Sequence, residues 1–505
     1  MRQQSASWQA FTGVAAATAG LGTAELAAAM VRQPPLLDAV GRLIVDTSPR
    51  PLVDLTVRLL GPADKAAVRG GVLTGVAALG ALAGLGSTRS SRHGSLLVGA
   101  ATLAGVGAAL RRPPRRPAGA LLAGACGTLA ATASMRTRSR ATLAAATAGG
   151  LAALAGARRL HRADRAAHDR QRERLTLRPL SPKPRPVDHA ETWTGVSRLI
   201  TPAADFYLAD VNLGAPMMDP TTWRLRLRGL LERPIELSLP DLADLGLVEF
   251  DAVMVCIHNA VGGDRVGNAR WLGVPLHRLL ALAGPSPQAT TLITRAVDGF
   301  AISLPLPGHG TPAGYVVVGM NGHPLTPAHG FPARVITPGL YGQYTGVKWL
   351  TELVVTAEPR PDYWPARGWP QPLVAIRPMA RIDTPADTAR CSGPVHIAGV
   401  AWAPDAGVER VEVSLDGRPW QPAELADELA PTAWRRWRLI ADLDAGTHRI
   451  QARAVSRDGR VQDPTPRPPF PGGASGLHTI HVRVDPAGPF RPCAPSAPGL
   501  RNRSG

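Results

Sequence analysis

From Ala66 to Ala163 this chain of 505 residues contains no Asp or Glu, and this stretch constrains the fold most. Uncharged or nearly uncharged runs occur at 8–31, 70–86, 94–110, 117–135 and 141–157. Each has about the length that crosses ~30 Å of hydrocarbon as a helix. A soluble helical bundle needs a charged outer face, which these runs lack. The sequence predicts a multi-pass transmembrane α-helical anchor over residues 1–160, with Ala and Gly permitting close helix packing.

The net charge of +18 is concentrated in Arg clusters next to the apolar runs, for example at 111–116 and in the basic, Pro-containing linker at 161–190. Such clusters are typical of segments that flank membrane spans and contact lipid headgroups. We therefore expect lipid, and no nucleic acid, as a partner. Residues 35–69 carry four Asp among Leu and Val, which favours an amphipathic segment at the membrane interface.

Aromatic residues and alternating apolar residues become frequent from about residue 188. Short strands at 252–256, 291–296, 334–337 and 350–356, with a helix at 276–283, predict a mixed α+β domain over 191–384. Five further strand patterns separated by Asp-Gly turns predict an all-β sandwich of immunoglobulin type over 385–485. Residues 486–505 are predicted to be a disordered tail.

Two segments of the α+β domain are candidates for chemistry. In the first, a strand delivers Cys256 into a loop that contains Gly262 and Gly263, where a thiolate is suited to act as a metal ligand or nucleophile. In the second, Arg334 and Lys348 lie on either side of a Gly-rich segment and are suited to bind phosphate. The residues alone leave two alternatives open: a buried, inert Cys256 and a loop with ordinary surface cations.

Taken together, the motifs resemble the sulfite oxidase family of molybdopterin enzymes. They are Cys256-x-x-Asn259, Trp271-x-Gly-Val-Pro-Leu276, Asp298-Gly-Phe-Ala-Ile-Ser303-Leu-Pro305, Met320-Asn-Gly-x-Pro-Leu325, His329-Gly-Phe-Pro-x-Arg334 and Gly346-Val-Lys348-Trp349. The resemblance extends from Trp193 to Val484. It implies a molybdenum–molybdopterin cofactor, a small-molecule redox substrate, and a C-terminal sandwich that forms a homodimer.

The resemblance also implies roles for individual residues. Cys256 would be the catalytic residue and the only protein ligand of the metal. The other cofactor-binding residues implied are Phe206, Tyr207, Asn259, Thr294, His329, Arg334, Gly346, Val347 and Lys348. Ala204 stands where one bacterial branch of the family has an Asn, which removes one cofactor contact.

Two departures from the family pattern concern the substrate. Phe300 occupies the position of an active-site Tyr, and Ala260 follows Asn259 where the family has a sulfite-binding Arg. Because an oxyanion needs convergent cations, we expect an S-oxide or a neutral substrate rather than sulfite, unless Arg265 or Arg270 substitutes.

The predicted spans contain no His, so no haem is expected, and electrons would pass to a separate carrier or a quinone. The Arg distribution favours a cytoplasmic C-terminal part, whereas resemblance to membrane-tethered members favours the extracytoplasmic side of the cell membrane, which we predict. Cys391 and Cys493 are expected to be free thiols. The alternative function is a non-catalytic, membrane-tethered binding module derived from the same fold.

Overall fold

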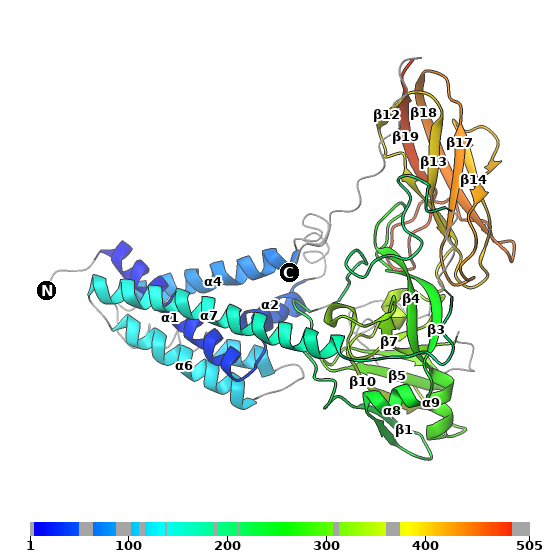
Figure 1. The fold of residues 1–505 in the computed structure, drawn as a ribbon. Helices are drawn as coiled ribbons and strands as arrows, with labels where there is room; N and C mark the ends of the chain where they lie inside the picture. Colours follow the sequence, from blue (N-terminus) through cyan, green and yellow to red (C-terminus); the bar gives the residue numbers. More distant parts are fainter. Residues whose placement is uncertain are drawn as a thin grey trace. The chain divides into compact units, whose positions relative to one another are not determined.

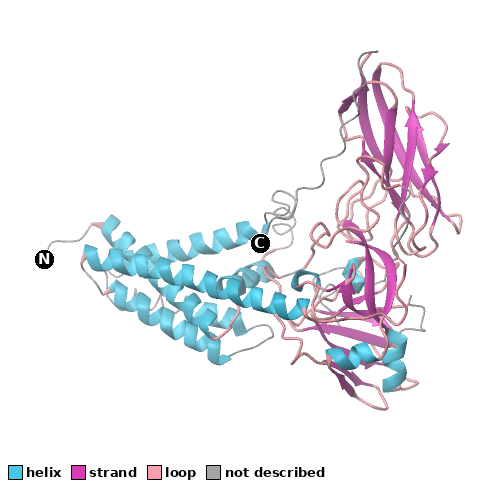
Figure 2. Cartoon of the chain, in the orientation of Figure 1, coloured by secondary structure: helices cyan, strands magenta, loops and turns pink. Residues whose placement is uncertain are grey.

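The computed structural model describes residues 5–49, 64–86, 101, 103–110, 117–136, 139–184, 190–210, 212–306, 313–359 and 374–486. The chain divides into two compact units (Figure 1). The first comprises Met1–Arg172 with Asp210–Met217 and Val297–Gly299; the second comprises Glu173–Ala209, Met218–Ala296 and Phe300–Gly505. Figure 2 shows that helices dominate the first unit and strands the second.

The first unit contains α1 (Ala6–Met30), α2 (Leu36–Thr47), α4 (Asp64–Gly86), α6 (Pro117–Met135) and α7 (Arg140–Glu173). Helix α1 packs against α4 and α6 through small residues. A Cβ on Gly13 would lie 1.9 Å from the carbonyl oxygen of Gly80, and one on Gly22 would lie 2.1 Å from that of Gly150. Only glycine permits these close backbone approaches, as in helix pairs packed through small residues.

Three helices among the described residues are long and apolar enough to cross a membrane, judged by length and composition: Ala6–Met30, Lys65–Gly86 and Pro117–Met135. The predicted span 141–157 lies within the longer helix α7. Of the predicted span 94–110, only residues 101 and 103–110 are described, and they are helical. The five-span anchor therefore remains a prediction.

Charged residues of α2 and α4 bind one another and the segment Asp210–Met217, which belongs to the same unit. Asp38 is buried and binds the guanidinium of Arg69 at 2.8 Å. Arg69 also donates to the carbonyl oxygen of Leu213, and Arg42 donates to the side chain of Asn212. The segment predicted to be amphipathic thus includes a helix whose polar residues bind protein groups.

The α+β part of the second unit contains two sheets. Its elements are β1 (Leu225–Gly229), β2 (Ile235–Leu237), α8 (Leu239–Asp244), β3 (Val248–Val255), β4 (Val266–Pro275), α9 (Leu276–Ala283), β5 (Thr291–Ala296), β6 (Ala301–Pro305), β7 (Tyr315–Met320), β8 (His323–Pro324), η2 (Pro327–His329), β9 (Arg334–Ile336), α10 (Gly342–Thr345) and β10 (Leu350–Thr356). One sheet has the order β2-β1-β10-β5-β6; the other has the order β3-β4-β7-β8, with β9 paired to β7. The strands and helix predicted for this region are confirmed.

Strand β3 is buried on both faces, and its side chains point alternately into two different hydrophobic cores. Val253 and Val255 belong to the main core of the unit. Phe250, Ala252 and Met254 face a second core that includes Phe206, Trp271 and Phe331. Since successive side chains of a strand point to opposite faces, the residue after Val255, which is Cys256, continues the Met254 face.

The all-β part contains β11 (Met379–Thr384), β12 (Ala389–Cys391), β13 (Val395–Trp402), β14 (Val408–Leu415), β15 (Gln421–Pro422), β16 (Glu424–Leu425), β17 (Arg435–Ala441), β18 (Gly446–Ser456) and β19 (His478–Val484). They form sheets of order β11-β13-β17-β16 and β12-β19-β18-β14-β15. Ile397 and Trp437 of the first sheet share one core with Val411 and Ile450 of the second. A sandwich is therefore present, and its immunoglobulin type stays a prediction.

One cysteine prediction is wrong. Cys391 is disulfide-bonded, whereas Cys126 and Cys256 are free. Cys493 lies outside the described residues. The expectation of a free Cys391 assumed that the two ends of the sandwich lie apart, but β12 pairs with β19, the last strand. This places Cys391 beside Val484, at the chain's exit from the sandwich.

Candidate functional site

Cys256 lies at the end of β3, where three hydrogen bonds fix the start of a loop. The backbone N–H of Cys256 donates to the carbonyl oxygen of Arg265 at 3.0 Å, and that of Asn259 donates to the carbonyl oxygen of Cys256 at 2.9 Å. The side-chain oxygen of Asn259 accepts from the backbone N–H of Arg265 at 2.9 Å. Asn259 therefore closes the loop on itself. We call residues 256–265 the thiol loop.

Aromatic rings cover the face of β3 from which Cys256 projects. Phe206 stacks on Tyr207 with ring centroids 5.4 Å apart, and it meets Trp271 and His329 edge-on at 5.6 and 5.7 Å. These contacts bring together residues separated by more than a hundred positions in the sequence. They bury Phe206 and His329 almost completely.

Two basic residues lie in the same region, carried by β9 and the segment before β10. Arg334 is 2% exposed; its guanidinium donates to the carbonyl oxygen of His329 and to the sulfur of Met254. Lys348 is 5% exposed and donates to the carbonyl oxygen of Ala328 at 2.8 Å. The turn at Gly330 has φ +105°, which favours glycine, and an added Cβ there would lie only 3.0 Å from that of Lys348.

Several buried polar atoms here have no hydrogen-bond partner among the described residues. They are the hydroxyl of Tyr207, the side-chain nitrogen of Asn259, Nε of Arg334, and both amide atoms of Gln343. Buried polar groups in native proteins are nearly always hydrogen-bonded, so such a set indicates a polar ligand that the protein is built to hold. No described carboxylate forms an ion pair with Arg334, which indicates an anionic ligand.

Burial controls the protonation of these groups. It lowers the pKa of His329 to about 4, so the imidazole is neutral and donates from Nε2 to the carbonyl oxygen of Ala203 at 2.8 Å. It lowers the pKa of Arg334 to about 10, which leaves the guanidinium charged at neutral pH. Burial also raises the pKa of Tyr207, which stays a phenol, and that of the Cys256 thiol.

Comparisons with known proteins show the family to which the domain carrying these residues belongs. Residues 212–364 match the family model described as oxidoreductase molybdopterin binding domain. Sulfite oxidase of Arabidopsis thaliana is 30% identical over 331 residues, which cover 53% of this chain and 83% of that protein. The uncharacterized oxidoreductase YuiH of Bacillus subtilis is 32% identical over 151 residues, 30% of this chain and 74% of that protein. The chain belongs to the sulfite oxidase-type family of molybdopterin oxidoreductases.

Mitochondrial sulfite oxidase of Homo sapiens is 31% identical to this family member over 362 residues, 61% of this chain. The match covers 65% of the human protein, slightly less than two thirds of its length. Among solved structures, the sulfane dehydrogenase SoxCD from Paracoccus pantotrophus has a TM-score of 0.49 at 23% identity, covering 63% of this chain and 90% of that chain.

The residues present suit a molybdopterin cofactor. An anionic phosphate group matches the buried guanidinium of Arg334, and the unpaired Tyr207, Asn259 and Gln343 atoms offer hydrogen bonds to a polar heterocycle. Two of these contributors, Met254 and Gln343, were not singled out from the sequence. Gln343 lies between Gly342 and Gly346, inside the Gly-rich segment that the sequence marks as a candidate for phosphate binding. Its position there is the sequence feature that could have indicated a role in the site.

Some residues implied by the family resemblance lie differently. Thr294 is on β5 of the other sheet, and its hydroxyl donates to the carbonyl oxygen of Ile302. Val347 is fully buried in the main core, and its carbonyl oxygen accepts from the backbone of Val335. Gly346 ends α10. This helix carries Gln343, and an added Cβ on Gly346 would lie 3.6 Å from Cε of Met254.

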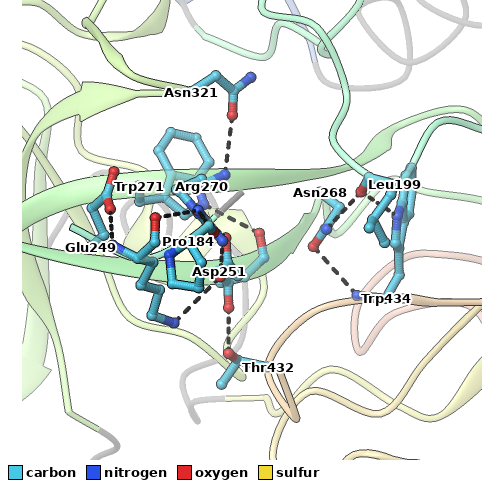
Figure 3. Close-up of polar contacts among 12 residues, drawn as sticks. Pro184, Leu199, Glu249, Asp251, Asn268, Arg270, Trp271, Asn321, Thr432 and Trp434 are labelled. Atoms are coloured by element: carbon cyan, nitrogen blue, oxygen red, sulfur yellow. Dashed lines mark hydrogen bonds and ion pairs between the residues drawn. The ribbon is translucent and has the colours of Figure 1, made fainter. Parts of the chain in front are cut away.

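The suggestion that Arg270 replaces the family's missing substrate Arg is not supported by its contacts. Its guanidinium binds both oxygens of Asp251, at 2.8 and 3.1 Å, and the carbonyl oxygen of Pro184 (Figure 3). Asp251 is 1% exposed and lies on the face of β3 opposite Met254 and Cys256. Arg265 is different: it is opposite Cys256 across the strand pair, and its charge tends to lower the pKa of the Cys256 thiol.

Proposed function

We propose that this chain is a membrane-anchored oxidoreductase in which the thiolate of Cys256 binds molybdenum and the pocket around Arg334 binds the pterin and its phosphate. One observation carries the proposal: a guanidinium that is 2% exposed, with no carboxylate partner among the described residues, lies on the Met254 side of β3, the side from which Cys256 projects. A buried charge without a counterion is costly, so its presence argues for an anion that binds there.

When bound, the molybdenum cofactor supplies two-electron chemistry, in particular the transfer of an oxygen atom to or from a substrate. The protein's own part is to hold and orient the cofactor. Arg334 and Lys348 bind the phosphate, and the neutral His329 and the protonated Tyr207 contact the pterin. Asn259 holds the thiol loop closed so that Cys256 meets the metal.

The substrate proposed is an S-oxide or another neutral molecule rather than sulfite. Arg270 is bound to Asp251 and faces away, and Phe300 lacks a hydroxyl. Among the described residues of the thiol loop, Arg265 is the charged residue that lies opposite Cys256. A single cation gives weaker attraction for a dianion than the convergent set that sulfite requires.

The catalytic domain is proposed to lie outside the cytoplasm, anchored by the helical unit and passing electrons to a separate carrier or a quinone. The disulfide at Cys391 supports this location, because disulfides persist in oxidising compartments. Three candidate spans support the anchor. Protease treatment of intact cells tests the location, since release of the sandwich by external protease requires exposure outside the cell.

The test of the proposed function is the content of molybdenum and pterin in the full chain purified from a host that makes the cofactor. Near-stoichiometric amounts are expected in the wild type. Cys256→Ser should remove activity and alter the metal's spectrum, while Cys126→Ser, which changes a free thiol in α6, serves as the matched control. Folded wild-type protein with neither metal nor pterin would contradict the proposal and favour a binding module.

A further inference from the structure

The β-sandwich contacts the thiol loop through Arg381 of β11. The guanidinium of Arg381 donates to the carbonyl oxygen of Gly263 at 3.0 Å. Its other nitrogens bind the carboxylate of Asp383 at 2.7 Å and the hydroxyl of Ser197 at 2.8 Å. The side chain is 11% exposed, and Asp383 in turn accepts from the backbone N–H of Ser197. Because these bonds are partly buried and involve charge, Arg381 has little freedom to move.

The second contact comes from His478 at the start of β19. Its Nδ1 accepts from the backbone N–H of Ile382 at 2.9 Å, which fixes the ring and leaves the proton on Nε2. The ring lies directly against Gly262, where an added Cβ would come within 2.3 Å of Nε2 and 2.4 Å of Cδ2. Gly262 has φ +75°, so this turn of the thiol loop requires glycine for its backbone as well as for the ring.

These two contacts lie a short distance along the chain from the sulfur. An added Cβ on Gly263 would lie 2.8 Å from the side-chain oxygen of Asn259, the same oxygen that binds the backbone of Arg265. Arg265 in turn accepts from the backbone of Cys256. Gly263, which Arg381 holds, therefore lies close to the Asn259 side chain, and Asn259 in turn binds the residue that pairs with Cys256.

The sandwich side also touches the Gly-rich segment that follows Arg334. Gly473, in the segment before β19, lies against Tyr341, and an added Cβ there would come 2.4 Å from the Tyr341 hydroxyl. Tyr341 is the residue before α10, which carries Gln343. Segments of the sandwich thus contact both the thiol loop and the Gly-rich segment that the cofactor phosphate is proposed to reach.

We propose that the β-sandwich positions the metal-binding thiol: Arg381 and His478 hold the thiol loop in the conformation that Cys256 needs to bind molybdenum. This role is separate from dimerisation, and it rests on the proposed function in that Cys256 is taken as the metal ligand. Arg381 and His478 are positioning residues, since neither touches the sulfur itself.

The experiment measures how fast iodoacetamide alkylates Cys256 in the full chain, purified in detergent from a host that cannot make the cofactor. Peptide mass spectrometry distinguishes Cys256 from Cys126. The variants are Arg381→Ala and His478→Asn; Asn keeps an acceptor for the backbone of Ile382 but removes the ring from Gly262. Each rate is taken at a fixed interval below that variant's own unfolding midpoint, so that a general loss of stability does not count.

The matched control is Arg435→Ala. Arg435 is a partly buried arginine of β17 that donates to the carbonyl oxygens of Ala426 and Val408, which lie outside the thiol loop. Loss of a charge-assisted hydrogen bond from a loop makes its opening easier by about tenfold or more. We expect Cys256 to be alkylated about tenfold faster in Arg381→Ala than in the wild type, faster than in the wild type in His478→Asn, where the ring no longer packs against Gly262, and at the wild-type rate in Arg435→Ala.

A second readout uses cofactor-loaded protein. The electron paramagnetic resonance spectrum of the one-electron-reduced metal reports the metal–sulfur geometry, and it should change in both thiol-loop variants and not in Arg435→Ala. Equal alkylation rates in all variants and an unchanged spectrum would overturn the inference. Failure of the proposed function is distinguishable, because a wild type without metal contradicts that proposal whatever the alkylation rates are.

Discussion

Arg334→Met is expected to stabilise the cofactor-free protein while abolishing its ability to hold the cofactor. Burial lowers the pKa of Arg334 from its ordinary 12.5 to about 10. Neutral pH lies below both pKa values, so Arg334 is charged in the folded and the unfolded state. Burying this charge destabilises the folded state by about 3 kcal/mol. Met has a similar length and no charge, so this cost disappears.

The gain is partly offset, because the variant loses the bonds from Arg334 to the His329 carbonyl at 3.2 Å and to the Met254 sulfur at 3.5 Å. Each is worth about 1 kcal/mol or less. The free energy of unfolding should rise by about 1–2 kcal/mol, and in a domain of about 150–250 residues each kcal/mol raises the unfolding midpoint by about 2–4 °C. Thermal unfolding of cofactor-free protein, followed by Trp fluorescence, measures this change.

Arg270→Met is the matched control with the opposite expected sign. Arg270 is a partly buried arginine of this domain that pairs with the buried Asp251, and its removal leaves that carboxylate with Lys183 at 3.3 Å as its remaining ion-pair partner among the described residues. Removing one partner of a buried ion pair lowers the free energy of unfolding by about 3–5 kcal/mol. We expect a loss near the lower end, because Lys183 still partly neutralises Asp251. If Arg334→Met lowers the midpoint as Arg270→Met does, or still copurifies with a full complement of pterin, the assignment of an anion site to Arg334 is refuted.

Three further outcomes are expected. Burial lowers the pKa of His478 to about 4, so the unfolded state binds more protons than the folded state between pH 6.5 and 4, and the protein loses stability as the pH falls through that range. In urea unfolding measured as a function of pH, His478→Asn should reduce this loss by up to about 3 kcal/mol. An unchanged pH profile would contradict the burial of the ring. Cys391→Ser should lower the free energy of unfolding by about 2–4 kcal/mol, and non-reducing peptide mapping that finds Cys391 unbonded would contradict the disulfide. Gln343→Leu should leave the cofactor-free protein at least as stable, because it removes two unpaired buried atoms, yet lower its pterin content; normal pterin content would exclude Gln343 from the site.

The local elements followed from the sequence because each rests on a short pattern. The strands at 291–296 and 350–356 and the helix at 276–283 were predicted with the bounds that the structure has. Alternation and apolar spacing are properties of consecutive residues, so they need no knowledge of distant contacts. The motifs around Cys256 and Arg334 were visible for the same reason.

Pairings between distant segments were not accessible in this way. The sequence offered Arg270 and Arg265 as equal substitutes for a missing cation, and the pairing of Asp251 with Arg270 across β3 and β4 separates them. The bonded state of Cys391 followed from the pairing of β12 with β19, which brings the two ends of the sandwich together. Register and sheet order decide such contacts, and neither is encoded in a single segment.

The sequence by itself determined the acid-free, apolar first third, the mixed and all-β domains that follow, and the residue types of the site. Composition and periodicity fix which residues must leave water, because hydrophobic burial depends on the local pattern. Only the tertiary structure decided that Arg334 has no described carboxylate beside it, that Gln343 has unpaired polar atoms, and that Arg381 and His478 of the sandwich contact the thiol loop. Desolvation, charge pairing and steric contact depend on what surrounds a group in space, and that surrounding is assembled from distant parts of the chain.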